Sequence, residues 1–110
     1  MEMLKKWILS VAENEEIEGI VLGEMDWDDD YESEEIQSYK KYPKNKLLSW
    51  EEALPFISYE FCSGYGAPGC QAITAWTKSK VIFVSQYDGS TRIEFVPRNP
   101  CDCEPEMPGG

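Results

Sequence analysis

Apolar side chains near the start of the chain recur at helical spacing. The residues at positions i, i+3, i+4 and i+7 are Leu4, Trp7, Ile8 and Val11. This spacing places them on one stripe of a helix, so we expect a helix over residues 3–12 with the stripe facing the core. The next apolar run, residues 17–22, is rich in Ile and Val and ends at Gly23, which predicts a β-strand.

A second helix is indicated by its polar residues. Ser49 is followed three positions later by Glu52, which is the spacing of a capping box, and acidic side chains suit the positive end of the helix dipole. Pro55 lies too far along this helix to be a first-turn proline. We therefore expect a kink or a shift near residues 51–54, before the segment 56–61.

Three β-rich runs in the second half of the chain predict a β-meander. Asp88-Gly89 is a strong signal for a two-residue turn between strands at residues 81–87 and 90–96, and Lys78-Ser79 is a weaker turn signal after residues 71–77. If both turns contain two residues, counting outward from them fixes the register of the strands. One face then collects the core side chains Ile73, Ala75, Ile82, Val84, Ile93 and Phe95.

These elements predict one α+β domain over residues 1–110, in which a small antiparallel sheet packs against two helices. The sheet consists of the three-stranded meander and the N-terminal strand. Residues 25–46 show no sustained period, mix acidic side chains with Ser, Lys and Tyr, and contain Pro43. They predict a long acidic loop, and loops of this length in small domains are often functional.

The opposite face of the meander carries an unusual mixture for a solvent-facing surface. It presents the aromatic side chains of Trp76, Phe83 and Tyr87 together with Arg92. Arg98 and Asn99 follow directly, between two prolines that hold the backbone extended. An aromatic ring can stack on a base and a guanidinium suits a phosphate, so these six residues are candidates for a nucleotide-sized binding site. Alternatively, this face is a dimer interface or lies under the acidic loop.

The charge of the chain restricts its partners. Its 21 acidic and 10 basic residues give a formal net charge of −11, and the chain has no His. This balance argues against DNA or RNA as a partner and favours a basic one. The thirteen acids and two lysines of residues 1–35 account for all of the excess, whereas residues 36–110 are balanced. The part with the aromatic face and both arginines can therefore hold a small anion.

Three sequence patterns resemble known chemical motifs but lack features that those motifs require. The glycines of residues 64–69 match the spacing of a dinucleotide fingerprint, but a strand should precede it and a helix should follow it. The acidic run 26–34 lacks the glycine and the final glutamate of a calcium loop. The four cysteines lack the two close pairs of a zinc site, so we expect free or core thiols.

Without His, and without a nucleophile beside a base, no catalytic arrangement is visible. We therefore expect a binding protein that is not an enzyme and that uses no metal or other cofactor. The chain shows no signal peptide, lipidation motif or membrane span, so we expect it to act in the cytoplasm and not at a membrane.

The second half of the chain resembles the Thoeris anti-defence sponge proteins, a phage family that sequesters immune signals of the cyclic ADP-ribose type. The motifs that carry this resemblance, over about residues 47–110, are Leu48-Ser-Trp-Glu-Glu-Ala53, Gly64-Tyr-Gly-Ala-Pro68, Ala75-Trp-Thr77, Tyr87-Asp-Gly-Ser-Thr91, Pro97-Arg-Asn-Pro100 and Pro108-Gly-Gly110. The resemblance implies a small α+β protein that forms homo-oligomers and captures the signal without cleaving it. It implies that an aromatic ring stacks on the base of the signal and that arginines bind its phosphates. Arg98 is the first residue to which the phosphate-binding role is assigned. The family is expected to use more than one arginine, and Arg92 is the only other arginine here.

Two function classes, and a third possibility, remain open. The leading hypothesis is a non-enzymatic binder of a small cyclic nucleotide signal. The alternative is an acidic inhibitor of phage type that binds a basic nucleic-acid-handling protein by mimicking phosphate charge, as the acids of residues 1–35 suggest. A third possibility is an interaction module whose aromatic face binds a partner protein.

Overall fold

The computed structural model describes residues 2–24, 42–61, 70–87, 90–105 and 107. Within these residues, two helices pack together with antiparallel strands, so the predicted α+β class is confirmed. In chain order the elements are β1 (Glu2–Met3), α1 (Leu4–Ala12), β2 (Gly19–Leu22), β3 (Leu47–Leu48), α3 (Trp50–Ile57), β4 (Glu60–Phe61), β5 (Ile73–Trp76), β6 (Lys80–Tyr87) and β7 (Ser90–Pro97).

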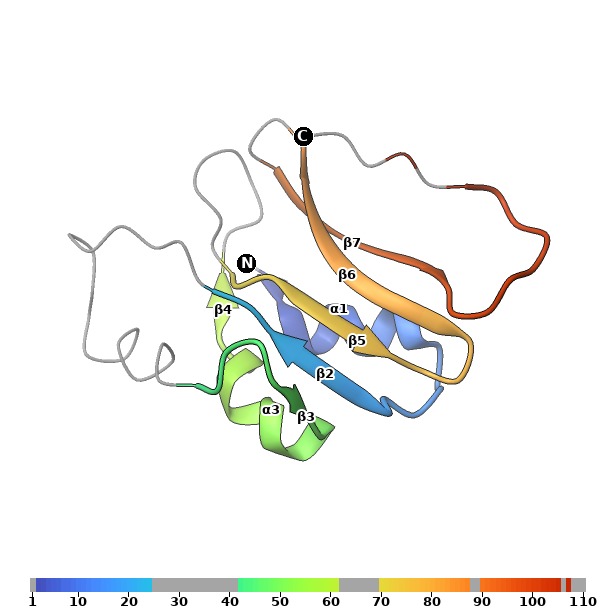
Figure 1. Ribbon diagram of the computed structural model, residues 1–110. Helices are drawn as coiled ribbons and strands as arrows, with labels where there is room; N and C mark the ends of the chain where they lie inside the picture. The colour runs from blue at the N-terminus through green and yellow to red at the C-terminus, as the bar shows by residue number, and fades with distance from the viewer. Residues whose placement is uncertain (1, 25–41, 62–69, 88–89, 106, 108–110) are drawn as a thin grey trace.

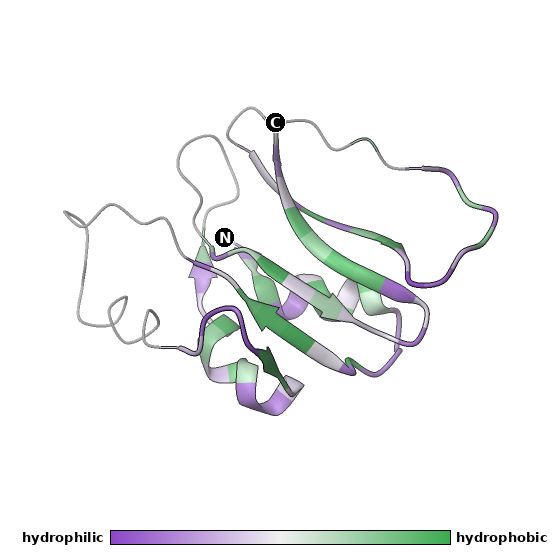
Figure 2. Ribbon diagram, in the orientation of Figure 1, coloured by the Kyte–Doolittle hydropathy of each residue, from purple (hydrophilic) through white to green (hydrophobic). Residues whose placement is uncertain are grey.

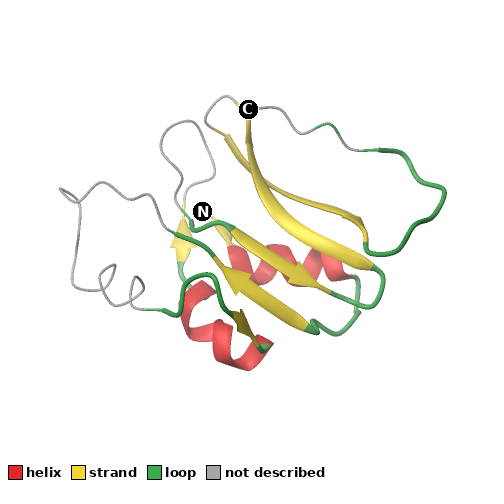
Figure 3. Ribbon diagram, viewed as in Figure 1, coloured by secondary structure: helices red, strands yellow, loops and turns green. Residues whose placement is uncertain are grey.

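Five of the strands form one antiparallel sheet in the order β3-β2-β5-β6-β7 (Figures 1 and 3). The predicted N-terminal strand is β2, and it joins the sheet by pairing with β5, the first strand of the meander. The two remaining strands, β1 and β4, form a separate two-stranded ladder. Strands β1, β3 and β4 are two residues long and were not predicted from the sequence.

The register predicted from the two turns is confirmed. In the β6–β7 pair, Gln86 lies opposite Thr91 and Val84 lies opposite Ile93. In the β5–β6 pair, Ala75 lies opposite Ile82. The turn at residues 78–79 is closed by a hydrogen bond from the Thr77 amide to the Lys80 carbonyl oxygen at 3.0 Å. Residues 88 and 89 themselves lie outside the described residues.

One face of the sheet and both helices enclose the core. Helix α1 packs against β6 and β7, α3 packs against β2, and the two helices contact each other. Apolar residues are concentrated in the central strands (Figure 2). The largest fully buried apolar side chains are Leu4, Ile8, Ile20, Leu22, Ile57 and Ile82. Since burying an aliphatic side chain contributes about 1.5–3 kcal/mol, this shared interior is the main source of stability.

Phe95 is an exception to the predicted core face. Its backbone pairs with Ile82 as expected, but its side chain remains 42% exposed. β7 is the edge strand of the sheet, so no further strand of the described residues lies beside Phe95 on that side. The Lys80 ammonium lies 5.0 Å from the centroid of the Phe95 ring instead. The prediction that Phe95 belongs to the core is therefore wrong.

The second helix begins as predicted and ends sooner. Ser49 caps it: the Ser49 hydroxyl accepts from the Glu52 amide at 3.2 Å, and the Glu52 carboxylate accepts from the Ser49 amide at 3.0 Å. These hydrogen bonds hold the pKa of Glu52 below its usual value, and the one from the Ser49 backbone has the largest effect. The helix runs through Pro55 without a break and stops at Ile57, so the following residues do not continue it and Phe61 belongs to β4.

The long acidic stretch joins two neighbouring antiparallel strands. β2 pairs with β3, and residues 25–41 between them lie outside the described residues. Where the described chain resumes, the Tyr42 hydroxyl donates to the Gly23 carbonyl oxygen at 2.6 Å, and the Asn45 amide donates to the Leu22 carbonyl oxygen at 2.8 Å. Burial raises the pKa of Tyr42 to about 12, so it remains a donor at neutral pH. The last residues of the predicted loop are thus fixed to the end of β2.

Ile8 and Leu9 are neighbours on α1 and provide a matched test of the packing. Ile8 is fully buried, whereas Leu9 is 44% exposed. We expect Ile8→Ala to lower the free energy of unfolding by about 2–5 kcal/mol because it leaves a cavity. We expect Leu9→Ala to cost less than about 1 kcal/mol. Urea denaturation measures both values, and equal losses would contradict this arrangement of the helix.

Candidate functional site

A hollow of about 390 Å³ opens on the sheet face that neither helix covers, which we call the outer face. By register, the outer face carries Gly19, Val21, Leu47, Thr74, Trp76, Val81, Phe83, Ser85, Arg92, Glu94 and Val96. The hollow is lined by Glu18, Gly19, Val21, Leu47, Trp76 and Arg98. It therefore brings together two of the residues predicted to bind a ligand, Trp76 and Arg98, and we name it the Trp76–Arg98 hollow.

Gly19 forms part of the floor of the Trp76–Arg98 hollow. Gly19 is the cross-strand partner of Trp76, so no side chain stands beside the indole on the β2 side. A Cβ atom at residue 19 would lie 2.8 Å from Cδ1 of Leu47. Leu47 itself is 71% exposed, on the short edge strand β3. The missing side chain thus lets the exposed leucine lie against β2 at the position opposite Trp76, where it adds to a mostly apolar floor of the kind that suits a flat ligand.

Arg98 is held at the rim of the hollow by three hydrogen bonds. Its Nη1 donates to Oε1 of Glu18 at 2.8 Å and to the carbonyl oxygen of Thr77 at 3.0 Å. Its backbone amide donates to the carbonyl oxygen of Ser79 at 2.9 Å. The Arg98 side chain is still 39% exposed, and Nε and Nη2 donate to no atom of the described residues. The guanidinium is therefore positioned and retains donors for an anion.

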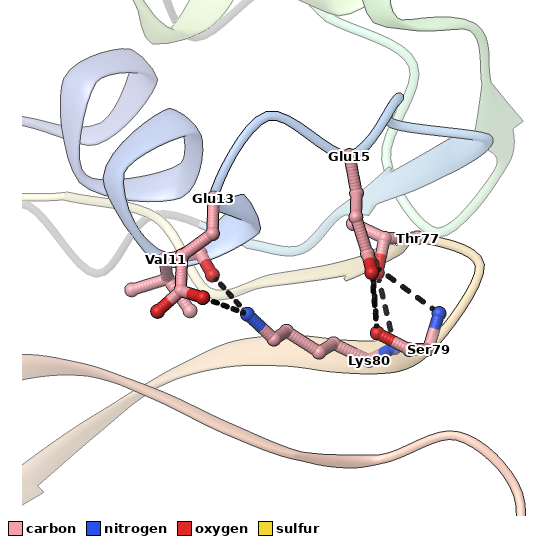
Figure 4. A network of polar contacts seen from close by, with 6 residues as sticks. All are labelled: Val11, Glu13, Glu15, Thr77, Ser79 and Lys80. Atoms are coloured by element: carbon pink, nitrogen blue, oxygen red, sulfur yellow. Dashed lines mark hydrogen bonds and ion pairs between the residues drawn. The ribbon is translucent and has the colours of Figure 1, made fainter.

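The turn that holds Arg98 is itself held by one carboxylate (Figure 4). Oε1 of Glu15 accepts from the hydroxyl of Thr77 at 2.6 Å, and the hydroxyl of Ser79 donates to Oε1 at 2.8 Å and to Oε2 at 2.7 Å. The amide of Ser79 adds a longer contact of 3.3 Å to Oε1. These hydrogen bonds hold the pKa of Glu15 below its usual value, and the one from the Thr77 hydroxyl has the largest effect.

Lys80 ties the other side of this turn to α1. Its ammonium donates to the carbonyl oxygen of Val11 at 2.7 Å and lies 3.5 Å from Oε2 of Glu13 (Figure 4). The last carbonyl groups of a helix lack partners within the helix, and a cation suits the negative end of its dipole. Lys80 thus fixes the turn at residues 77–80 to the end of α1.

The remaining candidate residues lie outside the Trp76–Arg98 hollow. Asn99 lines a neighbouring hollow of about 470 Å³ together with Glu15, Lys78, Ser79, Pro97, Pro100 and Cys101. Phe83, on β6, lies diagonally opposite Trp76 of β5 on the outer face. Arg92 pairs with Ser85 on the part of the β6–β7 hairpin that extends past β5. Arg98 follows Arg92 by six positions, or about 20 Å of extended chain.

Tyr87 stands at the far end of β6, opposite Ser90 and farther from Arg98 than Arg92 is. The structure thus spreads the six predicted residues along the outer face and the segment that follows it, instead of gathering them in one pocket.

Four lining residues of the Trp76–Arg98 hollow were not predicted as site residues: Glu18, Gly19, Val21 and Leu47. Gly19 is the first residue of β2, and a glycine in a strand is a known signal of a close approach of backbone or ligand. Val21 was assigned only to the predicted strand. Glu18 and Leu47 gave no local signal, because their roles depend on the pairing of β2 with β3 and β5.

A separate groove of about 310 Å³ lies near the start of α3 and is strongly acidic. Its lining residues are Leu9, Glu15, Glu16, Ile17, Glu18, Ser49, Trp50 and Glu51, so four carboxylates accompany three apolar side chains. Glu15 and Glu18 have the partners described above, whereas Glu16 and Glu51 form no hydrogen bond or ion pair with the described residues.

The thiols and the metal-ligating side chains offer no further site in the described part of the chain. Cys70 is buried, which raises the pKa of its thiol to about 12, and Cys101 and Cys103 are exposed and free. Cys62 lies outside the described residues. No group of three or more acidic or Cys side chains that could hold a metal ion occurs among the residues that are described.

Neither α1 nor α3 could cross a bilayer, and no helix in the described ranges is long and apolar enough to do so. Comparison with known proteins gives no match: no protein-family model, no curated protein and no solved structure matches the chain. The resemblance to the Thoeris anti-defence sponge proteins therefore stays a prediction.

The lowered pKa of Glu15 predicts a pH-dependent contribution to stability. Its folded-state pKa lies below the unfolded value of about 4.3, so the contribution is complete above that value and is lost as the pH falls through the folded pKa. We expect Glu15→Gln to destabilise the protein by a constant amount near neutral pH, and we expect this difference to shrink below about pH 4.3.

Urea denaturation at a series of pH values measures this difference. Glu16→Gln is the control, because Glu16 is exposed and has no hydrogen-bond partner among the described residues. If the curves for the wild type and Glu15→Gln stay parallel down to pH 3, Glu15 does not stabilise the turn through its charge.

Proposed function

We propose that the protein binds a small phosphate-bearing nucleotide in the Trp76–Arg98 hollow and does not transform it. The observation that carries this proposal is that one hollow contains both a partly buried indole and a guanidinium held at its rim. The indole offers a face on which a base can stack, and the guanidinium offers donors for a phosphate. The volume of about 390 Å³ lies within the range of about 300–1,000 Å³ that is common for small-molecule sites.

The absence of His from the chain supports binding without catalysis. The Glu18 carboxylate is already engaged with Arg98, and no Ser, Thr or Cys lines the Trp76–Arg98 hollow. Together with the resemblance noted above, this leads us to propose that the ligand is an immune signal of the cyclic ADP-ribose type. A protein that sequesters it would block host defence against phage, acting in the host cytoplasm as a homo-oligomer and without DNA, RNA or membrane partners.

Arg98→Ala tests the proposed function. We expect it to weaken the binding of cyclic ADP-ribose isomers by about 10- to 100-fold, because hydrogen bonds to a charged group contribute about 1.5–3 kcal/mol. Calorimetry measures the affinities, and mass spectrometry of ligand released from the purified protein identifies what is bound. Arg92→Ala is the matched control, since it removes the same charge about 20 Å along β7.

Two results would contradict the proposed function. One is an affinity weaker than about 100 μM for every nucleotide tested, because a sequestering protein must compete with a receptor for a scarce signal. The other is unchanged affinity in Arg98→Ala when ligand is bound by the wild type.

A second candidate function is the binding of a basic protein. The groove that contains Leu9, Trp50 and four glutamates favours it, since exposed apolar side chains and unpaired carboxylates together suit a lysine- or arginine-rich segment. The excess of acids in residues 1–35 would steer such a partner towards this end of the molecule.

Glu16→Gln combined with Glu51→Gln tests this second function. We expect the pair to weaken the binding of a labelled arginine-rich peptide by about 2- to 20-fold at low salt, because each exposed ion pair contributes about 0.2–1 kcal/mol. The salt dependence of the affinity should also become flatter. Fluorescence anisotropy measures both, with Glu104→Gln as the control for net charge. Equal losses in the control would show that no particular groove is used.

A further inference from the structure

We propose that Glu18 competes with the phosphate of the ligand for the Arg98 guanidinium, so that an anion without a stacking ring occupies the Trp76–Arg98 hollow only weakly. This inference rests on the proposed function and adds a selectivity rule to the same site. Both residues line the hollow, and the Glu18 carboxylate lies 2.8 Å from Nη1 of Arg98. A guanidinium recognises a carboxylate and a phosphate with the same donor geometry.

The contact between Glu18 and Arg98 is suited to exchange. The two side chains are 45% and 39% exposed, and ion pairs in such positions contribute little to stability because water and salt screen them. Arg98 does not depend on Glu18 for its place, since it also donates to the carbonyl oxygen of Thr77 and is anchored through its backbone to Ser79. A ligand can therefore displace the carboxylate without releasing the arginine.

The backbone of Glu18 keeps its charge close to the hollow after displacement. Its amide donates to the carbonyl oxygen of Trp76 at 2.7 Å, so the residue stays beside the indole while its side chain moves. Any anion must displace the carboxylate, or bind the remaining donors of Arg98 beside it, and must tolerate the nearby negative charge. A nucleotide also gains stacking on Trp76, which offsets that cost. Glu18 thus lowers the affinity for every anion, so that only an anion that also stacks on Trp76 binds tightly.

Such a penalty would be useful in a protein that sequesters a scarce nucleotide. Inorganic phosphate is abundant in cells and competes for an arginine that has no partner. An internal carboxylate weakens this competition, while stacking on Trp76 retains the intended ligand.

Glu18→Gln tests the inference, because glutamine keeps the size of the side chain and removes its charge. Calorimetry is carried out with pyrophosphate and with ADP-ribose on the wild type, on Glu18→Gln and on Glu16→Gln. We expect Glu18→Gln to bind pyrophosphate at least about 5-fold more tightly than the wild type, and to bind ADP-ribose more tightly by a similar or smaller factor. Glu16→Gln removes the same charge two residues away and should stay within about twofold of the wild type, since Glu16 does not contact Arg98.

Adding Arg98→Ala to Glu18→Gln should abolish the gain in pyrophosphate affinity. That result would show that the gain depends on the arginine. Unchanged or weaker pyrophosphate binding in Glu18→Gln overturns the inference, and so does an equal gain in Glu16→Gln. If the wild type binds ADP-ribose through Arg98 but Glu18→Gln brings no gain, the inference alone fails. If neither the wild type nor Glu18→Gln binds pyrophosphate, ADP-ribose or any cyclic ADP-ribose isomer, the proposed function fails with it.

Discussion

The carboxylate of Glu15 accepts hydrogen bonds from the turn between β5 and β6 and holds it in place. The arrangement of the candidate site depends on this contact. Two hydroxyl groups and one amide of the turn converge on it. The same turn presents the carbonyl oxygens that receive the backbone and side chain of Arg98. Because Glu15 precedes β2 by only four residues, it also fixes the approach of β2 to β5. One solvated side chain thus links the position of a strand to the position of a guanidinium about 80 residues later in the chain.

Much of the fold could be predicted from the sequence, because its determinants are local. The capping box at Ser49 and the apolar stripe of α1 each lie within one or two helical turns. The register of the meander follows from two short turns, and it is correct. The short strands could not be predicted, since two residues cannot show a period. The exposure of Phe95 could not be predicted either, because the pattern of a strand does not reveal whether it lies at the edge of the sheet.

The candidate site was predicted only in part, and for a related reason. The register placed Trp76 on the face opposite the core, and the two prolines around Arg98 indicated that this arginine is held in an extended segment. The hollow itself lies where Gly19 pairs with Trp76, and that pairing joins residues 57 positions apart. No residue near Trp76 in the sequence indicates that it pairs with Gly19. Arg92 was grouped with Trp76 because both lie on one face, but β5 is half the length of β6 and does not reach the end of the sheet where Arg92 stands.

The two ends of the acidic stretch lie side by side, because the amide of Asn45 donates to the carbonyl oxygen of Leu22 and β3 then pairs with β2. In topological terms residues 25–41 are an insertion into a β-hairpin, closed at its base by residues that belong to the fold. The entropy of closing such a loop grows only slowly with its length. The segment can therefore lengthen, shorten or change its sequence during evolution at little cost to the sheet. The same property makes this base a natural place to graft a foreign peptide, such as an epitope or a protease site, without disturbing the strands on either side.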